Sequence, residues 1–298
     1  MSYLAGNKIL CHGNKYMVVF SVVVPNKGRT TLLYRGVESA LMQSFADIEI
    51  IIVDDSSDTV YNEIKKHFFG KTQVRVVRGE GKGESWARKR GFELSEGRYI
   101  ALLDSDDYWE SGKLQKHYEA FMSDQRIGVT WDQLIHINEA AGRKSYVALP
   151  RSLLKAKGNL FPPEVIRSEL VKSNFIHASC GIVDKRKVES IGGFPPIRPS
   201  DYILWLKMSQ HFYFSLVPFY MTIKFFNRTS MGMKKRLLIQ ELYNSFPIRL
   251  RFALRHTNEA PFKKLINIFF LIFLLTGFTI FLKDETRVYL QQKLLGVL

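Results

Sequence analysis

Four short runs of apolar, mostly β-branched residues in the first third of the chain constrain its fold more than any other feature. The runs cover residues 18–24, 48–53, 74–77 and 99–103, and each ends at a proline, an acidic residue or a glycine-rich segment. Runs that are apolar almost throughout, rather than alternating with polar residues, are typical of strands buried on both faces. They predict four strands at the centre of a sheet.

Helical patterns lie between these runs. Residues 30–43 place Leu33, Val37 and Leu41 on one helix face, and residues 85–95 follow a weaker version of the same pattern. The alternation of strand and helix predicts an α/β fold with a mostly parallel sheet and helices on both sides. Ligands of such sheets bind beyond the carboxyl ends of the strands. The polar residues that end the four runs would all lie at that edge.

The fourth run leads directly into Asp104, Ser105, Asp106 and Asp107. Carboxylates this close repel one another, and burying each one alone would be costly. A divalent cation relieves both problems, because Mg and Mn prefer hard oxygen ligands. We therefore expect a metal site at the end of this strand, with a phosphate-bearing ligand beside it. The alternative is an acidic helix start, in which Asp106 or Asp107 caps a helix that follows.

Composition limits the size, the compartment and the class of the protein. The chain has 298 residues, 46% of them hydrophobic and 24% charged, which is a globular balance that allows one large or two small domains. Its two cysteines, Cys11 and Cys180, form neither a disulfide framework nor a CxxC metal site, which favours a reducing compartment. We expect no secretory signal, because residues 1–16 contain no long apolar core.

The net charge of +15 is concentrated at the end of the chain. Residues 224–298 hold 13 of the 43 Lys and Arg residues but only 4 of the 28 Asp and Glu residues. Nucleic acid, an anionic membrane surface and an anionic substrate would each suit such a charge. The same segment contains the longest apolar stretch, so the membrane is favoured and no nucleic-acid partner is expected.

That apolar stretch covers residues 265–282 and is flanked by lysines. Its length is near the lower limit for a membrane-spanning helix, which needs about 17–25 residues. We expect residues 263–283 to hold the protein at a membrane, either as a spanning helix or by shallow insertion. A buried core helix is the alternative, because the stretch is apolar almost all round.

Five segments, taken in order, resemble family 2 glycosyltransferases with a GT-A nucleotide-sugar fold. They are SVVVP at 21–25, EIIIVDDSS at 49–57, GESWARKRG at 83–91, EGRYIALLDSDDYW at 96–109 and IGGFPPIRPSDYILWLKM at 191–208. The resemblance implies the following organisation: an N-terminal extension (1–17), a GT-A catalytic domain (18–225) with a nucleotide-sugar half (18–122) and an acceptor half (123–225), and a basic, apolar, helical membrane-associating region (226–298).

The resemblance also implies which residues bind the donor. They are Pro25, Asp54, Asp55, Gly83, Arg88 and Asp104. Asp54 and Asp55 would contact the uracil or the ribose, since carboxylates accept hydrogen bonds from N–H and hydroxyl groups; a turn-forming Asp pair is the alternative. Gly83 would let the backbone approach the ligand closely. Arg88 would pair with Asp54 or Asp104, or remain solvated on its helix.

Three further roles follow from the same resemblance. Asp106, in the D-x-D motif, would hold the Mn or Mg ion that neutralises the leaving UDP, while Asp104 would contact the ribose. Asp201 matches the carboxylate of the E-D-x-x-L-W motif and would be the general base of a single, inverting displacement; a helix N-cap is the alternative. Trp205 would stack on an acceptor sugar, or lie in the core.

Two segments depart from the pattern of the family. Residues 25–29 read PNKGR, where P-T-Y-N-R is usual, and Ser200 stands where a Glu normally precedes the base. These departures leave the donor sugar and the acceptor open. The base itself is retained, so we expect an active enzyme.

The resemblance implies an inverting, metal-dependent hexosyltransferase that moves a sugar from a nucleotide-diphosphate donor, expected to be a UDP-sugar, to a hydroxyl of a glycan or lipid-linked acceptor. Bacterial cell-envelope polysaccharide synthesis is the usual setting of relatives of this size, and we expect the protein at the cytoplasmic face of the bacterial inner membrane. The alternative is a sugar-1-phosphate nucleotidyltransferase, which shares the arrangement of strands that end in acids. That class usually carries a glycine-rich loop with Arg and Lys after its first strand, which residues 25–29 imitate only in part.

Overall fold

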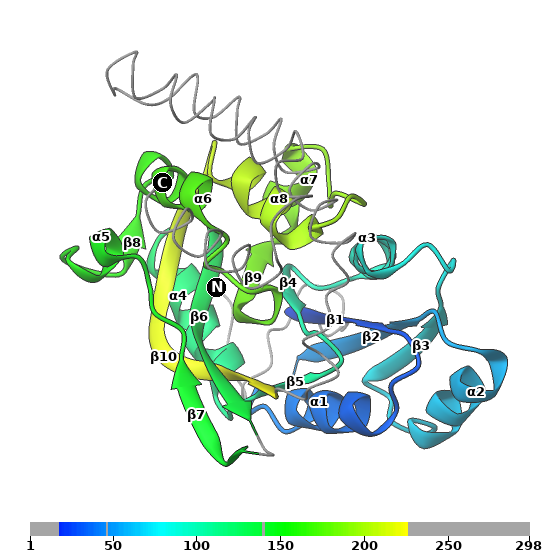
Figure 1. Ribbon diagram of the computed structural model, residues 1–298. Coiled ribbons are helices and arrows are strands. Elements are labelled where there is room, and N and C mark those ends of the chain that lie inside the picture. Colours follow the sequence, from blue (N-terminus) through cyan, green and yellow to red (C-terminus); the bar gives the residue numbers. More distant parts are fainter. Residues whose placement is uncertain (1–17, 46, 139–140, 226–298) are drawn as a thin grey trace, which may run out of the picture.

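The computed structural model describes residues 18–225 except residues 46 and 139–140. The predicted N-terminal extension and the predicted membrane-associating region therefore lie outside the described residues. Within the described part, a ten-stranded sheet is flanked by helices on both faces (Figure 1). The strands are β1 (Phe20–Asn26), β2 (Ile48–Asp54), β3 (Val74–Arg78), β4 (Tyr99–Leu102), β5 (Asp107–Trp109), β6 (Ile127–Asn138), β7 (Arg143–Tyr146), β8 (Leu160–Phe161), β9 (Gly181–Asp184) and β10 (Tyr213–Phe225).

The helices of the described residues lie between strands along the chain. They are α1 (Thr31–Leu41), α2 (Asp58–His67), α3 (Glu84–Leu94), α4 (Lys113–Ser123), α5 (Arg151–Leu154), α6 (Pro163–Lys172), the 3₁₀ helix η2 (Ala178–Cys180), α7 (Lys185–Ser190) and α8 (Ser200–Met208). The four predicted strands are confirmed as β1 to β4, and the two helical patterns are confirmed as α1 and α3.

The strand order is β3-β2-β1-β4-β9-β6-β10-β5, with β7 beside β6 and β8 beside β10. The pairs among β3, β2, β1 and β4 are all parallel, as predicted for the first half of the domain. The direction changes at β9, which is antiparallel to both β4 and β6. The second half is therefore a mixed sheet, and its last strand, β5, returns to the segment that follows β4.

The strands at the centre are buried on both faces, which explains their continuous apolar character. In β1, Val22 and Val24 pack in one layer with Leu33 and Val37 of α1. Val23, between them, faces the opposite layer, where Phe92 of α3 packs. All three valines are fully buried. Burying such a side chain stabilises the fold by about 1.5–3 kcal/mol. The valines of β1 therefore stabilise the packing of helices on both faces of the sheet.

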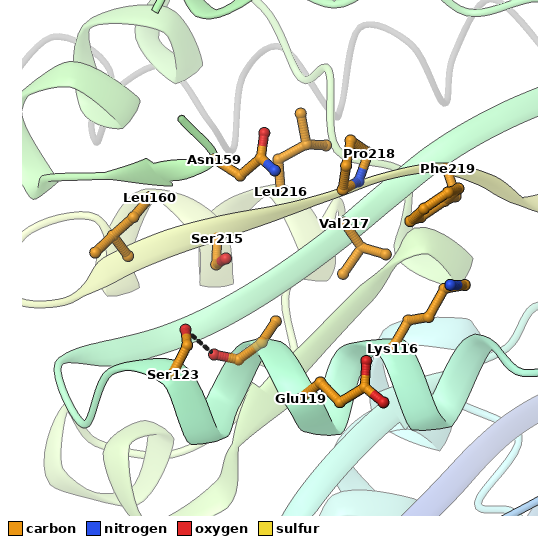
Figure 2. A pocket seen from close by; sticks show the side chains of 11 residues that line it. Lys116, Glu119, Ser123, Asn159, Leu160, Ser215, Leu216, Val217, Pro218 and Phe219 are labelled. Carbon is orange, nitrogen blue, oxygen red and sulfur yellow. Dashed lines mark hydrogen bonds between the residues drawn. The ribbon is translucent and has the colours of Figure 1, made fainter. Parts of the chain in front are cut away.

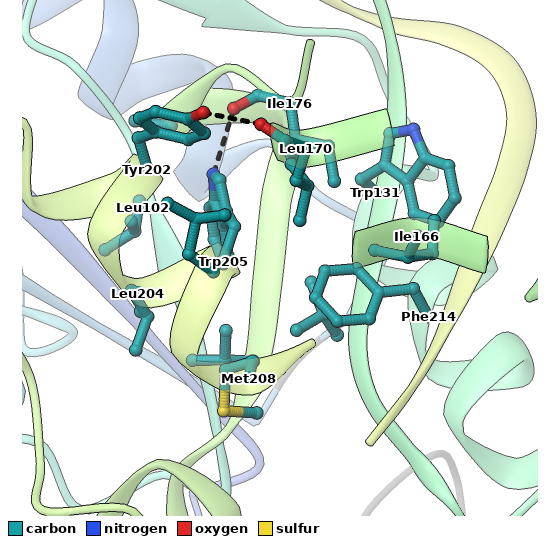
Figure 3. Close-up of a cluster of buried hydrophobic side chains, with 14 of the residues drawn as sticks. Leu102, Trp131, Ile166, Leu170, Ile176, Tyr202, Leu204, Trp205, Met208 and Phe214 are labelled. Atoms are coloured by element: carbon teal, nitrogen blue, oxygen red, sulfur yellow. Dashed lines mark hydrogen bonds between the residues drawn. The ribbon is translucent and has the colours of Figure 1, made fainter. Parts of the chain in front are cut away.

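The second core layer surrounds α8 (Figure 3). Trp205 has no exposed surface, and its indole N–H donates a hydrogen bond to the carbonyl of Ile176 at 2.9 Å. A Cβ added to Gly181 would lie 2.5 Å from the Trp205 ring. The prediction that Trp205 stacks on an acceptor sugar is wrong for this structure, because the ring is enclosed on all sides. Trp205 is a core residue, which was the alternative.

Neither of the two aspartate segments that could start a helix provides the N-cap of a helix in the structure. The acids at the end of β4 lead into the short strand β5, and α4 begins only at Lys113, after Gly112. The acidic helix start proposed for Asp106 or Asp107 is therefore wrong. In α8 the N-cap is Pro199, and Asp201 lies in the first turn. The carboxylate of Asp201 therefore does not cap the helix.

We find no helix in residues 18–45, 47–138 and 141–225 that is long and apolar enough to cross a membrane. The apolar stretch at 265–282 lies outside the described residues.

Candidate active site

The carboxyl ends of β1 and β2 meet in register at one edge of the sheet. Pro25 is buried in β1, and the next residue, Asn26, is the register partner of Asp54. The Asn26 amide donates a hydrogen bond to Asp54 Oδ1 at 2.7 Å, and the Ser56 hydroxyl donates to the same oxygen at 2.6 Å. Ser56 also accepts from the backbone N–H of Gly28. Asp54 is fully buried, so in this structure its carboxylate orders the loop after β1.

Asp55 is the partly exposed member of the acidic pair, and it organises the glycine-rich loop after β3. Its two carboxylate oxygens accept hydrogen bonds from the backbone N–H groups of Gly81 at 2.9 Å and Gly83 at 3.1 Å. Gly81 and Gly83 have φ values of 71° and 90°, which favour glycine. At Gly79 a Cβ would lie 2.0 Å from Asp55 Oδ1. The glycines therefore allow the loop to close around this carboxylate.

Arg88 of α3 connects acids that are distant in the sequence. Its Nη2 donates to Asp104 Oδ1 at 2.6 Å and also pairs with Glu84, one turn earlier. Its Nη1 donates to the Ser200 hydroxyl at 3.3 Å and lies 3.9 Å from Asp201 Oδ1. Of the two partners considered from the sequence, Arg88 thus pairs with Asp104. One buried guanidinium brings the D-x-D segment and the start of α8 together.

The charges of this pair are stabilised by their surroundings. Burial by itself would raise the pKa of Asp104, but Arg88 and then Lys224 outweigh it and lower that pKa to about 2. Burial likewise opposes the charge of Arg88, but Glu84 and Asp104 together raise its pKa. Both groups are therefore ionised at neutral pH.

Asp106 lies at the rim of the site, where its side chain is 10% exposed. Its Oδ2 lies 3.3 Å from Nη2 of Arg29, which follows β1. Nη1 of Arg29 donates to the Ser105 hydroxyl at 3.1 Å. Arg29 is 45% exposed, so its contact with Asp106 is open to exchange with a ligand.

Asp107 begins β5 and is almost fully buried. Its Oδ2 accepts a hydrogen bond from the Ser179 hydroxyl at 2.5 Å, and Ser179 in turn accepts from the backbone N–H of Asp104 at 3.0 Å. Its Oδ1 lies 3.3 Å from Nζ of Lys224. Burial raises the pKa of Asp107 to about 7, because Lys224 and Ser179 only partly offset the burial and the neighbouring Asp104 and Asp106.

The candidate base, Asp201, is 13% exposed. Besides Arg88, its neighbours include Asn174, whose amide donates to Asp201 Oδ2 at 3.4 Å. Its position in the first turn of a buried helix gives it a rigid mount. Arg88 therefore connects this carboxylate to the acid cluster, which consists of Asp104, Asp106 and Asp107. The Asp201 side chain also stays partly exposed to solvent.

The acids fit a divalent cation that is shared with a diphosphate. Among the described residues, no group of three or more His, Cys, Asp or Glu side chains is arranged to hold a metal ion alone. Mg, however, is commonly held by one or two carboxylates together with substrate phosphates and water. Asp106, at the rim, offers such an oxygen, because its side chain is 10% exposed and its partner Arg29 is 45% exposed. The donor set therefore suits a cation that arrives with its phosphate ligand.

Sequence reasoning missed three members of this site. Arg29 stood in the PNKGR segment after the first strand, which was a signal for it. Ser179 and Lys224 carried no local signal, because each is a single polar residue in an otherwise ordinary segment. Only the sheet brings them to the acids.

A separate hollow of about 390 Å³ lies between α4 and β10 (Figure 2). Lys116, Glu119 and Phe219 are among its lining residues, and Lys116 Nζ lies 4.1 Å from the centre of the Phe219 ring. None of the residues that line it belongs to the acid cluster. We therefore assign the candidate site to the carboxyl edge of the sheet.

Comparison with known proteins agrees with this assignment. The sequence model of glycosyl transferase family 2 matches residues 21–192, more than half of the chain. The Escherichia coli UDP-Glc:alpha-D-GlcNAc-diphosphoundecaprenol beta-1,3-glucosyltransferase WfaP is 31% identical over 196 residues, which are 64% of this chain and 70% of the relative. The putative teichuronic acid biosynthesis glycosyltransferase TuaG of Bacillus subtilis (strain 168) is 36% identical over 104 residues, 34% of this chain and 41% of the relative.

Among solved structures, S. aureus TarS 1–349 in complex with UDP-GlcNAc is similar to this chain. The TM-score is 0.64 at 19% sequence identity, and the match covers 90% of this chain and 77% of the TarS chain. This likeness confirms the expected GT-A fold. The family match, which covers the segment that contains the acid cluster, shows that the chain belongs to glycosyl transferase family 2.

Proposed function

We propose that this protein is an inverting, metal-dependent glycosyltransferase that moves a sugar from a UDP-sugar to a hydroxyl of a glycan or lipid-linked acceptor in cell-envelope polysaccharide synthesis. The observation that carries the proposal is the placement of Arg88 between Asp104 and Asp201. The guanidinium of Arg88 contacts both the donor-side acid, Asp104, and the candidate base, Asp201. The relatives include a UDP-glucose enzyme with a diphosphoundecaprenol acceptor and a teichuronic acid enzyme, which supports the donor and the acceptor class.

The donor would lie along the carboxyl edge of β1, β2 and β4. Asp55 and the glycine-rich loop of residues 79–83 would face the nucleoside, and Asp104 would offer a carboxylate to the ribose hydroxyls. Asp106 would hold a divalent cation together with the diphosphate. When bound, such a cation neutralises the charge that develops on the leaving UDP. Arg29 lies at the same rim and adds a positive charge there.

Asp201 would remove the proton from the acceptor hydroxyl. The acceptor oxygen then forms a bond to the anomeric carbon from the face opposite the diphosphate, while the bond from that carbon to the UDP oxygen breaks. This single displacement inverts the anomeric centre. Arg88 and Asn174 would keep the carboxylate aimed at the acceptor, because each contacts a different oxygen of Asp201.

We also propose that the protein works at the cytoplasmic face of a bacterial inner membrane, held there by residues 263–283. Support comes from the apolar stretch with flanking lysines and from the lipid-diphosphate acceptor in the name of the E. coli relative. Flotation of the full chain with anionic lipid vesicles, compared with a chain that carries Asp in place of two apolar residues in 265–282, tests this. Equal flotation of both chains would refute it.

The activity is tested by incubating the full chain with Mn and a panel of UDP- and GDP-sugars, with a GlcNAc-diphospho-lipid as acceptor. We expect UDP release and a glycosylated lipid whose new linkage has the opposite anomeric configuration to the donor. A parallel reaction with UTP and sugar-1-phosphates tests the alternative, nucleotidyl transfer. Pyrophosphate release in that reaction, without sugar transfer in the first, would overturn the proposal.

A further inference from the structure

Lys224 is held at the acid cluster by the register of the sheet. It lies in β10, where its antiparallel partner in β5 is Asp107 and its parallel partner in β6 is His136. Two residues earlier, the buried Thr222 donates a hydrogen bond to Asp132 Oδ1 at 2.9 Å, which anchors β10. The position of Lys224 beside the acids is therefore set by strand pairing and not by a loop.

The ammonium group of Lys224 contacts two of the acids, and the Lys224 side chain is partly exposed. Its Nζ lies 3.3 Å from Asp107 Oδ1 and 3.8 Å from Asp104 Oδ2, and the side chain is 26% exposed. Lys113 is a useful contrast, because it is fully buried and enclosed by Asp132 and Thr222. An ammonium group has three N–H donors. Lys224 can thus face the acids and a ligand together.

The two described histidines that interact with Lys224 carry no charge near pH 7. The pKa of His177 is lowered to about 4 and that of His136 is lowered as well, in both cases by burial first and then by Lys224. Both imidazoles are therefore neutral near pH 7. Arg88 is almost fully buried and already contacts Asp104. Arg29 at the rim and Lys224 over Asp107 are partly exposed cations that contact the acids within the described residues.

We propose that Lys224 is a built-in cation of the donor-diphosphate subsite, and that its ammonium binds a phosphate oxygen of the donor, so that the protein binds UDP even without a divalent cation. This inference rests on the proposed function, because it takes the acid cluster as the place of the diphosphate. The physical basis is that a preorganised positive charge near the leaving group stabilises the charge that develops there. Lysine suits this role as a compact point charge.

The test is calorimetric titration of the full chain with UDP and with uridine, in EDTA and in Mn. In EDTA we expect the wild type to bind UDP, and Lys224→Met to bind it about 10- to 100-fold more weakly, as expected for the loss of one charged hydrogen bond. Uridine affinity should not change, because uridine lacks the diphosphate. Lys224→Arg should restore most of the UDP affinity.

Lys185→Met is the matched control. Its side chain is 20% exposed, and it follows Asp184, which pairs with Tyr99 at the amino end of β4, the edge opposite the site. UDP affinity should be unchanged in this variant. Because Lys224→Met leaves Asp107 without its cation, the double variant Lys224→Met/Asp107→Asn supplies a second, charge-balanced background in which UDP binding in EDTA should also be weak.

Two results would overturn the inference while leaving the proposed function intact. One is equal UDP affinity of wild type and Lys224→Met in EDTA. The other is a wild type that binds UDP only when Mn is present, since the diphosphate would then be held through the metal. A wild type that binds UDP in neither condition would instead remove the proposed function, and this inference with it.

Discussion

Arg88 Nη2 donates a hydrogen bond to Asp104 Oδ1 at 2.6 Å, and this bond joins the helix after the glycine loop to the acids at the end of β4. Both partners are largely buried. Breaking a buried pair by removing one partner leaves the other charge uncompensated, which typically costs about 3–5 kcal/mol. The bond is therefore important for stability as well as for the site.

Replacing Arg88 by Met tests that statement. We expect the free energy of unfolding to fall by about 3 kcal/mol, because Asp104 loses its main cation. Urea unfolding measures it. In the double variant Arg88→Met/Asp104→Asn the loss should be smaller than the sum of the two single losses, since the unpaired charge is gone. Additive losses would show that the two residues are not coupled.

Replacing Asp201 by Asn should stop transfer without weakening donor binding. The amide keeps the shape and the contact with Asn174 but cannot accept a proton, and loss of a general base costs about 10²–10⁴ in rate. UDP affinity should stay within about twofold of the wild type. Sugar transfer and UDP calorimetry are measured on the same sample. Near-normal turnover would rule out Asp201 as the base, and Asp124→Asn, in an exposed ion pair with Arg126, is the control.

Replacing Asp106 by Asn should remove the effect of Mn on UDP binding. A neutral amide is a poorer ligand for a hard cation than a carboxylate. We expect the Mn-dependent gain in UDP affinity to fall at least about 10-fold, while affinity in EDTA changes little. Glu119→Gln, in the remote hollow of Figure 2, should leave both values unchanged. An undiminished Mn effect in Asp106→Asn would assign the metal to other residues.

The buried His117 should make stability depend on pH. Its Nδ1 lies 2.7 Å from Thr130 Oγ1, and burial, then Lys113, lowers its pKa to about 4. The unfolded chain, with a pKa near 6.5, binds more protons between pH 4 and 6.5, so the free energy of unfolding falls as pH falls through that window. The contribution of His117 should be on the order of 2–3 kcal/mol.

Urea unfolding of the wild type and of His117→Gln at pH 7 and pH 4.5 measures this dependence. The glutamine does not titrate, so the loss of stability between the two pH values should be smaller in the variant. His177, whose pKa is also lowered to about 4, should keep part of the dependence in both proteins. An identical loss in both proteins would show that His117 does not contribute.

Replacing Gly79 by Ala should disturb the donor site through Asp55. The added Cβ would lie 2.0 Å from Asp55 Oδ1, so the carboxylate must leave its hydrogen bonds to Gly81 and Gly83. We expect UDP affinity to fall several-fold, because the loop loses both bonds. In an Asp55→Ala background the same replacement should have a much smaller effect, since the clashing side chain is gone. Equal effects in the two backgrounds would contradict this account.

Much of the fold could be predicted because it depends on residue patterns within short segments of the chain. The apolar runs that became β1 to β4, the helices α1 and α3, and the acids after β4 depend only on near neighbours in the chain. The parallel arrangement of these strands follows from their alternation with helices. The resemblance of the five segments then led to Asp104, Asp106 and Asp201 as candidates.

The tertiary structure alone decided which of these side chains face a ligand and which additional ones join them. Trp205 and Asp54 stand in segments that resemble family motifs, yet packing encloses both. Lys224 shows no local pattern and reaches Asp107 only because β10 pairs with β5 in one register. Register and burial depend on contacts between distant segments, and a slip of one residue would turn Lys224 to the other face. The sequence by itself determined the strands and their acidic ends, whereas the charge balance at the site was decided by the sheet.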